Sequence, residues 1–457
     1  MSNFSELIES LEYPLSEEQR AVVYSDKNCV VSAGAGSGKT TVLSWRFLRL
    51  VMEKHVSAER ILTLTFTRKA ALEMKSRITR RLIENRDSID PELLEHLGEA
   101  SISTIDSFLA NIVRMDSVRY GISRDLSMMD DDAEEELVRT LSLQFLEDEK
   151  NRRYTEALSR IYKPDSVRDD FFTQINKKLS FLSSTDPDEM LTFALDYTDE
   201  RIRELKQFLS DEFSAIEEDL EGEVLSAYDA FMEKWERGDY PPTLEFYKSR
   251  AKKGYLNGSK ESVKELSAIY KDQFLAALSI RESLPADKVY LEAIDAFSTM
   301  LKREKRKRSA LTFSDISDLA LDILTNSPEI RNSCRSKYDY IMIDEFQDNN
   351  NTQRKLLFLL SEKEGIMCDG IPTVDDISPE KLFFVGDDKQ SIYRFRGADV
   401  SVFNELRDDI RRAGGENLSL STNYRSEKLL IEHFNSVFRN VFASREHSYD
   451  ASFTETK

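Results

Sequence analysis

A glycine-rich loop near the start of the chain has the composition of a phosphate-binding site. Residues 30–43 read VVSAGAGSGKTTVL, an apolar strand followed by small residues, a lysine and two threonines. Glycines let the backbone turn tightly and direct its N–H groups at phosphate oxygens, Lys39 can reach the β- and γ-phosphates, and the Thr40 hydroxyl can bind Mg²⁺. The strict pattern GxxxxGK[ST] has glycine where this chain has Ala33, but the flanking strand and helix signals outweigh that departure. The residues expected to hold a nucleotide here are Ala33, Gly34, Ala35, Gly36, Ser37, Gly38, Lys39, Thr40 and Thr41.

A pair of carboxylates follows a second apolar run. Residues 340–348 read YIMIDEFQD, so the run leads directly to Asp344 and Glu345. One carboxylate at such a strand end can bind a metal ion, and the next can polarise an attacking water. Adjacent acids occur at strand ends by chance, but together with the glycine-rich loop they predict Mg²⁺-dependent hydrolysis of ATP. In this interpretation Thr40 and Asp344 bind the metal and Glu345 activates the water.

A third apolar run leads into aromatic and basic residues. Residues 383–399 read FFVGDDKQSIYRFRGAD, in which Tyr393 and Phe395 alternate with Arg394 and Arg396. Stacking of a nucleic-acid base on an aromatic ring contributes about 1–3 kcal/mol per base and tolerates any sequence, and arginines bind phosphates. The stretch therefore favours a surface for single-stranded nucleic acid. Two aromatic side chains in a core loop are the alternative.

Short apolar runs predict the strands that position these residues. Each run is followed by polar loop residues and then a helical pattern, which indicates a doubly wound α/β core with a parallel sheet. The runs are NCVVSA (28–33), ILTLTF (61–66), YDYIMID (338–344) and KLFFVGD (381–387). The middle of the chain has little glycine or proline and many apolar residues at helical spacing, which predicts an all-helical insertion. The expected division is 1–119 and 311–415 for the two parts of the core, 120–310 for the insertion and 416–457 for the start of a further domain.

Composition predicts a globular protein without membrane segments. No apolar run among the 457 residues approaches the roughly 18–20 residues of a membrane helix, and the first residues are acidic, so we expect a cytoplasmic protein. The net charge of −20 argues against a uniformly basic nucleic-acid binder. Positive charge is nevertheless concentrated, with seven bases and two acids in 66–86 and six bases in 302–308. These segments could bind nucleic acid, or they could be solvated helix faces.

Seven motifs in one order identify the family that this sequence resembles. The chain is similar to the N-terminal part of UvrD/Rep-type superfamily 1 DNA helicases, and its large helical insertion resembles the AddA/RecB-like branch. The motifs are LSEEQRAVV (15–23), the glycine-rich loop, TFTRKAALEMKSRI (65–78), ISTIDSF (102–108), DEFQD (344–348), VGDDKQSIYRFRGAD (385–399) and NYRS (423–426). The resemblance implies a RecA-like P-loop core and an ATP-dependent helicase or translocase that acts on single-stranded DNA in recombination and repair.

The resemblance also assigns roles to single residues. Gln19 would read the adenine edge through its amide, and Tyr424 would stack on the base. Gln390 would contact the γ-phosphate and the attacking water, and Arg425 would reach across the cleft to the γ-phosphate. The expected catalytic set is then Lys39, Asp344, Glu345, Gln390 and Arg425. The residues expected to contact DNA are Phe66, Thr67, Arg68, Tyr393, Phe395 and Arg396. Asp106 stands where many members have histidine, and no DNA contact is expected there because a carboxylate repels phosphate.

The end of the chain departs from the family pattern. Members continue past NYRS with a second RecA-like domain that carries a SKGLE-like motif and a final arginine motif, and neither occurs before Lys457. We therefore expect a truncated chain whose partner is the missing motor lobe or a nuclease subunit, and we expect weak hydrolysis and no unwinding by this chain on its own. Two alternatives remain, a module that binds ATP and DNA without catalysis and a P-loop ATPase unrelated to nucleic acid. The interleaved aromatic and arginine residues disfavour the second.

Overall fold

The chain divides into two compact units. One unit comprises Met1–Asp130 and Lys305–Lys457, and the other comprises Asp131–Glu304. A computed structural model describes residues 4–92, 100–161, 163, 171–173, 186–217, 220, 222–244, 246, 265–394, 397–442, 453 and 455–456.

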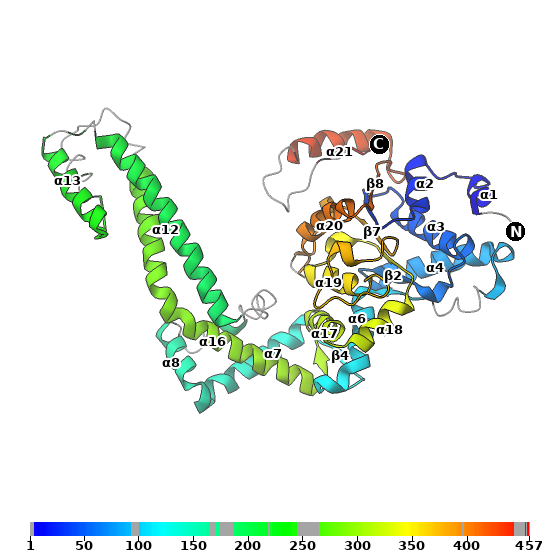
Figure 1. Ribbon diagram of the computed structural model, residues 1–457, viewed down its shortest axis with the longest axis horizontal. Coiled ribbons are helices and arrows are strands. Elements are labelled where there is room, and N and C mark those ends of the chain that lie inside the picture. The colour runs from blue at the N-terminus through cyan, green and yellow to red at the C-terminus, as the bar shows by residue number, and fades with distance from the viewer. Residues whose placement is uncertain are drawn as a thin grey trace. The chain divides into compact units, whose positions relative to one another are not determined.

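A six-stranded parallel sheet forms the centre of the first unit (Figure 1). Its strands lie in the order β3-β2-β6-β7-β1-β8, so the first strand of the chain lies between the last two. Because every pairing in this sheet is parallel, the carboxyl ends of all six strands meet at one edge. The strands are β1 (Cys29–Ala33), β2 (Ile61–Thr65), β3 (Ile102–Thr104), β6 (Tyr340–Ile343), β7 (Leu382–Gly386) and β8 (Glu416–Leu420).

Helices cover both faces of this sheet, because its strands present buried side chains alternately to each side. In β7, Leu382 and Phe384 join one apolar core, and Phe383 and Val385 join the other. One face is covered by α1 (Phe4–Glu9), α2 (Glu17–Tyr24), α3 (Lys39–Met52) and α4 (Arg68–Glu84). The opposite face is covered by α6 (Ile105–Asp116), α17 (Phe313–Asn326), α18 (Pro328–Lys337), α19 (Asn351–Leu359) and α20 (Val400–Arg412). This arrangement confirms the predicted doubly wound α/β core.

The six-stranded sheet contains two strands that the apolar runs did not predict. All four predicted runs form strands, but β3 and β8 were not predicted, and they are the two edge strands of the sheet. A further domain was expected to start at residue 416, and β8 pairs with β1 along its whole length, from Cys29 opposite Glu416 to Ala33 opposite Leu420. Residues 416–420 thus belong to the first sheet, and α21 (Lys428–Val441) follows them.

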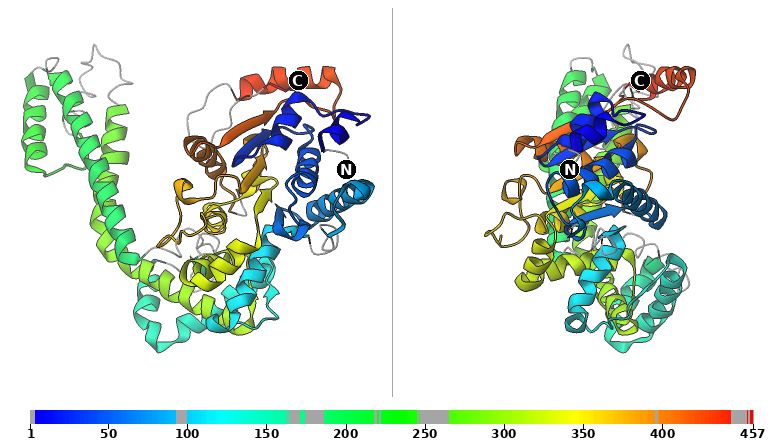
Figure 2. Two further views of the ribbon diagram at one scale, coloured as in Figure 1. Left: turned by 45° about the vertical axis from the view of Figure 1, so that its right-hand side comes forward. Right: turned by 90° about the vertical axis from the view of Figure 1, so that its right-hand side faces the viewer.

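The second unit is helical, as expected for the insertion. The views in Figure 2 show its two long helices, α12 and α16, side by side, and ion pairs join them, including Arg281 to Asp199 at 2.6 Å. Aromatic side chains including Phe213, Trp235 and Tyr270 form its core. Its helices are α7 (Asp131–Glu147), α8 (Arg152–Ile161), α12 (Pro187–Glu217), α13 (Gly222–Arg237), a π-helix (Ile269–Leu275) and α16 (Ala276–Arg308).

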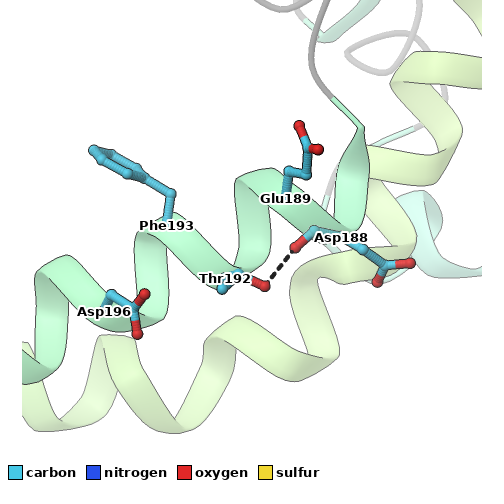
Figure 3. Close-up of a pocket in the computed structure, with 5 residues that line it drawn as sticks. All are labelled: Asp188, Glu189, Thr192, Phe193 and Asp196. Atoms are coloured by element: carbon cyan, nitrogen blue, oxygen red, sulfur yellow. Dashed lines mark hydrogen bonds between the residues drawn. The ribbon is translucent and has the colours of Figure 1, made fainter.

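A shallow hollow lies on α12 near its first turns (Figure 3). Three carboxylates surround it, and Phe193 points away from the helix with 73 % of its surface exposed. The residues that line it are Asp188, Glu189, Thr192, Phe193 and Asp196. None of them was predicted as a functional residue.

A small parallel ladder marks where the chain leaves and re-enters the first unit. It pairs β4 (Ser127–Met128) with β5 (Ala310–Leu311). The insertion therefore starts and ends at neighbouring points, which lets a helical unit interrupt the core without separating its strands. Within the described part of the chain, every helix is too short or too polar to cross a lipid bilayer.

Candidate nucleotide site and adjoining aromatic pair

The glycine-rich loop connects β1 to α3 in a shape that requires glycine. Gly36 and Gly38 have φ angles of +75° and +90°, a region that other residues rarely adopt. A Cβ atom on Gly38 would lie 2.9 Å from Nε2 of Gln19, and one on Gly36 would lie 2.8 Å from Oδ1 of Asn423. Inside the loop, the Ser37 hydroxyl donates to the Gly34 carbonyl at 2.8 Å. The loop therefore leads to the N-terminus of α3, where free backbone N–H groups favour an anion.

Lys39 is the first residue of α3, and its side chain contacts two residues in the segments that follow β6 and β7. Its Nζ donates to Oε2 of Glu345 at 2.8 Å and to Oε1 of Gln390 at 3.4 Å. The Lys39 side chain is 11 % exposed and that of Glu345 is 32 % exposed. Three predicted residues that follow β1, β6 and β7 therefore meet at the carboxyl edge of the sheet.

The acids that follow β6 are largely removed from water. Asp344 is buried and accepts a hydrogen bond from the Glu345 backbone N–H at 3.0 Å. Burial and the neighbouring Glu345 charge raise the pKa of Asp344 to about 7, and the same two causes raise the pKa of Asp348 to about 7. One oxygen of Asp348 is buried without a hydrogen-bond partner. The buried carboxyl groups of the site thus carry more negative charge than its basic side chains neutralise, which is typical of a cation-binding site.

Gln19 joins α2 to the glycine-rich loop. Its Oε1 accepts from the Ser16 backbone N–H at 3.2 Å as part of a capping box, and its Nε2 donates to the Ser37 carbonyl at 3.3 Å. Each end of an amide can form a second hydrogen bond, so Gln19 keeps one N–H and one oxygen lone pair. This N–H donor and this oxygen acceptor match the hydrogen-bonding groups on the edge of adenine.

The NYRS segment lies against the same loop. Asn423 donates through Nδ2 to the Ala35 carbonyl at 2.8 Å, and the Tyr424 backbone N–H donates to the Gly36 carbonyl at 2.9 Å. Oδ1 of Asn423 also accepts from the Arg425 backbone N–H at 2.8 Å. The side chains of Tyr424 and Arg425 are exposed beside the loop.

An aromatic pair adjoins the nucleotide site. The rings of Phe66 and Tyr393 pack with their centroids 4.8 Å apart and their planes 37° from parallel. Phe66 directly follows β2, Thr67 caps α4 by accepting from the Ala70 N–H at 3.2 Å, and the exposed Arg68 is the first residue of α4. The structure thus places these four DNA-contact candidates together, whereas Phe395 and Arg396 lie outside the described residues.

Two residues that were not predicted individually complete the site. Asp387 accepts from Nε2 of Gln390 at 2.6 Å and pairs with Lys389 at 2.8 Å, so it holds the loop after β7 in place. Gln347 donates through Nε2 to Oε2 of Glu345 at 2.8 Å. Both residues lie inside motifs that follow strands, and this position was the sequence feature that could have identified them. The residue type in a motif does not, however, reveal its hydrogen-bond partner.

The sequence comparisons agree with this geometry. The family model described as the UvrD/REP helicase N-terminal domain matches residues 15–411, which include the glycine-rich loop, DEFQD and Gln390. The chain belongs to this family. The predicted resemblance is therefore confirmed.

Several bacterial proteins are similar to this UvrD/REP-family chain over nearly all of its length. The A subunit of an ATP-dependent helicase/nuclease from Carboxydothermus hydrogenoformans is 31 % identical over 95 % of this chain and 40 % of the relative. Its counterpart of the same name from Streptococcus uberis is 30 % identical over 93 % of this chain and 38 % of the relative, and the exonuclease/helicase subunit RexA from Lactococcus lactis is 27 % identical over 94 % and 40 %. The chain spans about two-fifths of the length of these curated relatives.

Proposed function

We propose that this chain is an ATP-hydrolysing motor lobe of a DNA helicase or translocase that acts on single-stranded DNA in recombination and repair. One observation carries the proposal. Lys39 contacts both Glu345 and Gln390, and the loop that holds Gln390 continues to Tyr393, which packs on Phe66. Groups suited to phosphoryl transfer and groups suited to base stacking therefore share one loop.

In the proposed reaction, each residue of the nucleotide site has a separate role. Lys39 and the loop N–H groups bind the phosphates, and the Glu345 carboxylate orients the attacking water and accepts its proton. Gln390, held by Asp387, positions that water against the γ-phosphate. Arg425, whose side chain is exposed beside the loop, would stabilise the charge that develops on the transferred phosphoryl group.

The residues around Asp344 fit a magnesium ion. Mg²⁺ prefers one or two carboxylates together with hydroxyl, water and phosphate oxygens, and Thr40 and Asp344 would supply the protein ligands. The buried Asp344 carboxyl and the unpaired Asp348 oxygen indicate a site where a cation would restore the charge balance. A bound Mg²⁺ supplies neutralisation of phosphate charge.

The remaining proposed contacts use other side chains near the glycine-rich loop and the aromatic pair. Gln19 would use its free N–H and lone pair to bind adenine, and Tyr424 would stack on the base. Phe66 and Tyr393 would stack on DNA bases, with Thr67 and Arg68 at the phosphates. Phe395 and Arg396 remain candidates for the same surface.

The relatives suggest how this chain would work with others. Their names describe subunits of a helicase/nuclease, so we propose a protein partner that carries further motor or nuclease parts. The cytoplasmic location expected from the sequence stays a prediction.

Steady-state ATP hydrolysis with and without oligo-dT tests the proposed function. We expect weak DNA-stimulated hydrolysis that Glu345→Gln reduces by about 100-fold or more, because the substitution removes the carboxylate that orients water. Glu364→Gln is the matched control, since Glu364 is an exposed acid in a loop outside the site. Binding of both ATP and DNA without any hydrolysis would favour a non-catalytic module, and a chain that binds neither would exclude the proposal.

A further inference from the structure

Gln347 lies at the centre of the site, and both ends of its side-chain amide form hydrogen bonds. The residue is 1 % exposed. Its Nε2 donates to Oε2 of Glu345 at 2.8 Å, the same oxygen that receives Lys39. Its Oε1 accepts from the Asp387 backbone N–H at 2.9 Å. One buried amide therefore connects the acid after β6 to the first residue after β7.

Gln347 packs closely against the end of β7. A Cβ atom on Gly386 would lie 2.7 Å from Oε1 of Gln347 and 3.2 Å from its backbone nitrogen. Glycine at the end of β7 thus permits the amide to approach the strand closely. Because Gln347 fits tightly, a shift of Glu345 is not absorbed by slack around the amide.

A third contact extends from Gln347 toward the aromatic pair. The Ser391 hydroxyl donates to the Gln347 carbonyl at 3.1 Å. Ser391 lies two residues before Tyr393, whose ring packs on Phe66. Gln347 therefore contacts Glu345, the start of the loop after β7, and the part of that loop that leads to the candidate DNA surface.

We propose that Gln347 is a positioning residue that couples nucleotide binding to DNA binding, an inference that rests on the proposed function. A nucleotide phosphate would compete with Glu345 for Lys39. When Lys39 turns to the phosphate, the Glu345 carboxylate keeps Gln347 as its hydrogen-bond donor, so its new position is set by Gln347. Because Gln347 also contacts Asp387 and Ser391, its movement shifts the loop that carries Gln390 and Tyr393.

The test is a thermodynamic coupling measurement on the full 457-residue chain. The dissociation constant for fluorescein-labelled oligo-dT is measured with and without AMP-PNP and Mg²⁺, and their ratio is the coupling factor. In the parent we expect a factor within the usual range of about 5–150-fold, and in Gln347→Met, which keeps the volume but removes the hydrogen bonds, a factor near 1. Gln353→Met is the control, because Gln353 is also buried but caps α19 through the Asn350 N–H.

Further variants separate positioning from simple destabilisation. Gln347→Glu can still accept from the Asp387 N–H but cannot donate to Glu345 unless it is protonated, so its coupling factor should rise as the pH falls. Ser391→Ala removes only the hydroxyl contact and should lower the coupling factor while leaving AMP-PNP affinity unchanged. It also tests the proposal if Gln347→Met does not fold.

Each outcome is decisive. A coupling factor that is lost in Gln347→Met and kept in Gln353→Met supports the proposal. Parental coupling in both Gln347→Met and Ser391→Ala overturns it, as does a parent that binds both ligands without coupling. A parent that binds neither AMP-PNP nor oligo-dT would instead reject the proposed function itself.

Discussion

Glu345→Gln should make nucleotide binding tighter. In the structure Glu345 holds the Lys39 ammonium at 2.8 Å, so an incoming phosphate has to compete with this carboxylate. Glutamine keeps the shape of the side chain but removes its charge. Lys39 is then more readily available to the phosphate. The free energy of nucleotide binding becomes more favourable by the free energy that breaking the Lys39–Glu345 ion pair would have required.

The burial of the pair sets the size of this effect. Exposed ion pairs contribute about 0–1 kcal/mol, whereas breaking a fully buried pair costs about 3–5 kcal/mol. The side chains of Lys39 and Glu345 are 11 % and 32 % exposed, and Gln390 and Gln347 add hydrogen bonds at either end. We take about 1 kcal/mol after allowing for solvent screening, which corresponds to roughly fivefold tighter binding.

The assay is titration with a fluorescent, non-hydrolysable ATP analogue in the presence of Mg²⁺. Lys39→Ala alone should weaken binding by about tenfold or more, because it removes the charged partner of the phosphates. Glu345→Gln also relieves repulsion between carboxylate and phosphate, so the double variant is needed to isolate the release of Lys39. The gain should shrink in the Lys39→Ala background. Unchanged or weaker binding by Glu345→Gln, or an equal gain in both backgrounds, would refute the reasoning.

Three further predictions concern the aromatic pair, the buried acid and the loop. Tyr393→Ala should cost about 1–3 kcal/mol of affinity for single-stranded DNA in a fluorescence titration, whereas alanine at Tyr13, which is 81 % exposed outside the site, should cost nothing. Because the pKa of Asp344 is raised to about 7, the folded state keeps a proton that the unfolded chain loses above about pH 4. The contribution of Asp344 to the free energy of unfolding without Mg²⁺ should therefore fall from about pH 4 to 7, and urea unfolding should show a flatter pH dependence for Asp344→Asn than for the parent. Gly38→Ala should destabilise the fold by about 1 kcal/mol or more because of its positive φ and the contact with Gln19, whereas Gly34→Ala, with nothing within 4 Å of its Cβ, should leave thermal unfolding unchanged.

The central strands were predictable because burial on both faces leaves a continuous apolar run. VVSA in β1 and LFFV in β7 are such runs, and both form central strands. The edge strands β3 and β8 read IST and ENLSL, and they need little apolar sequence because each pairs on one side only. Their existence depends on the neighbouring strand, which a local pattern does not contain.

The candidate site was predictable as a set of motifs but not as a set of contacts. Lys39 could be assigned from its own loop, whereas its partners Glu345 and Gln390 lie 306 and 351 residues away along the chain. The role of Gln347 depends on Glu345, Asp387 and Ser391 at once. Only the strand order brings these together, so the sequence alone did not distinguish Gln347 from a glutamine that merely fills space.

The position of β1 between β7 and β8 also affects how the protein is made. During synthesis the strand emerges early, but its partner Phe383 follows Cys29 by more than 350 residues. At translation rates of 5–20 residues per second, both edges of β1 wait roughly 20–70 s for their partners. The helical unit Asp131–Glu304 can fold in that interval from its own contacts, while the apolar CVVSA segment remains open to pairing with other nascent chains. We therefore expect newly synthesised chains to depend on chaperones until residue 420 has emerged from the ribosome.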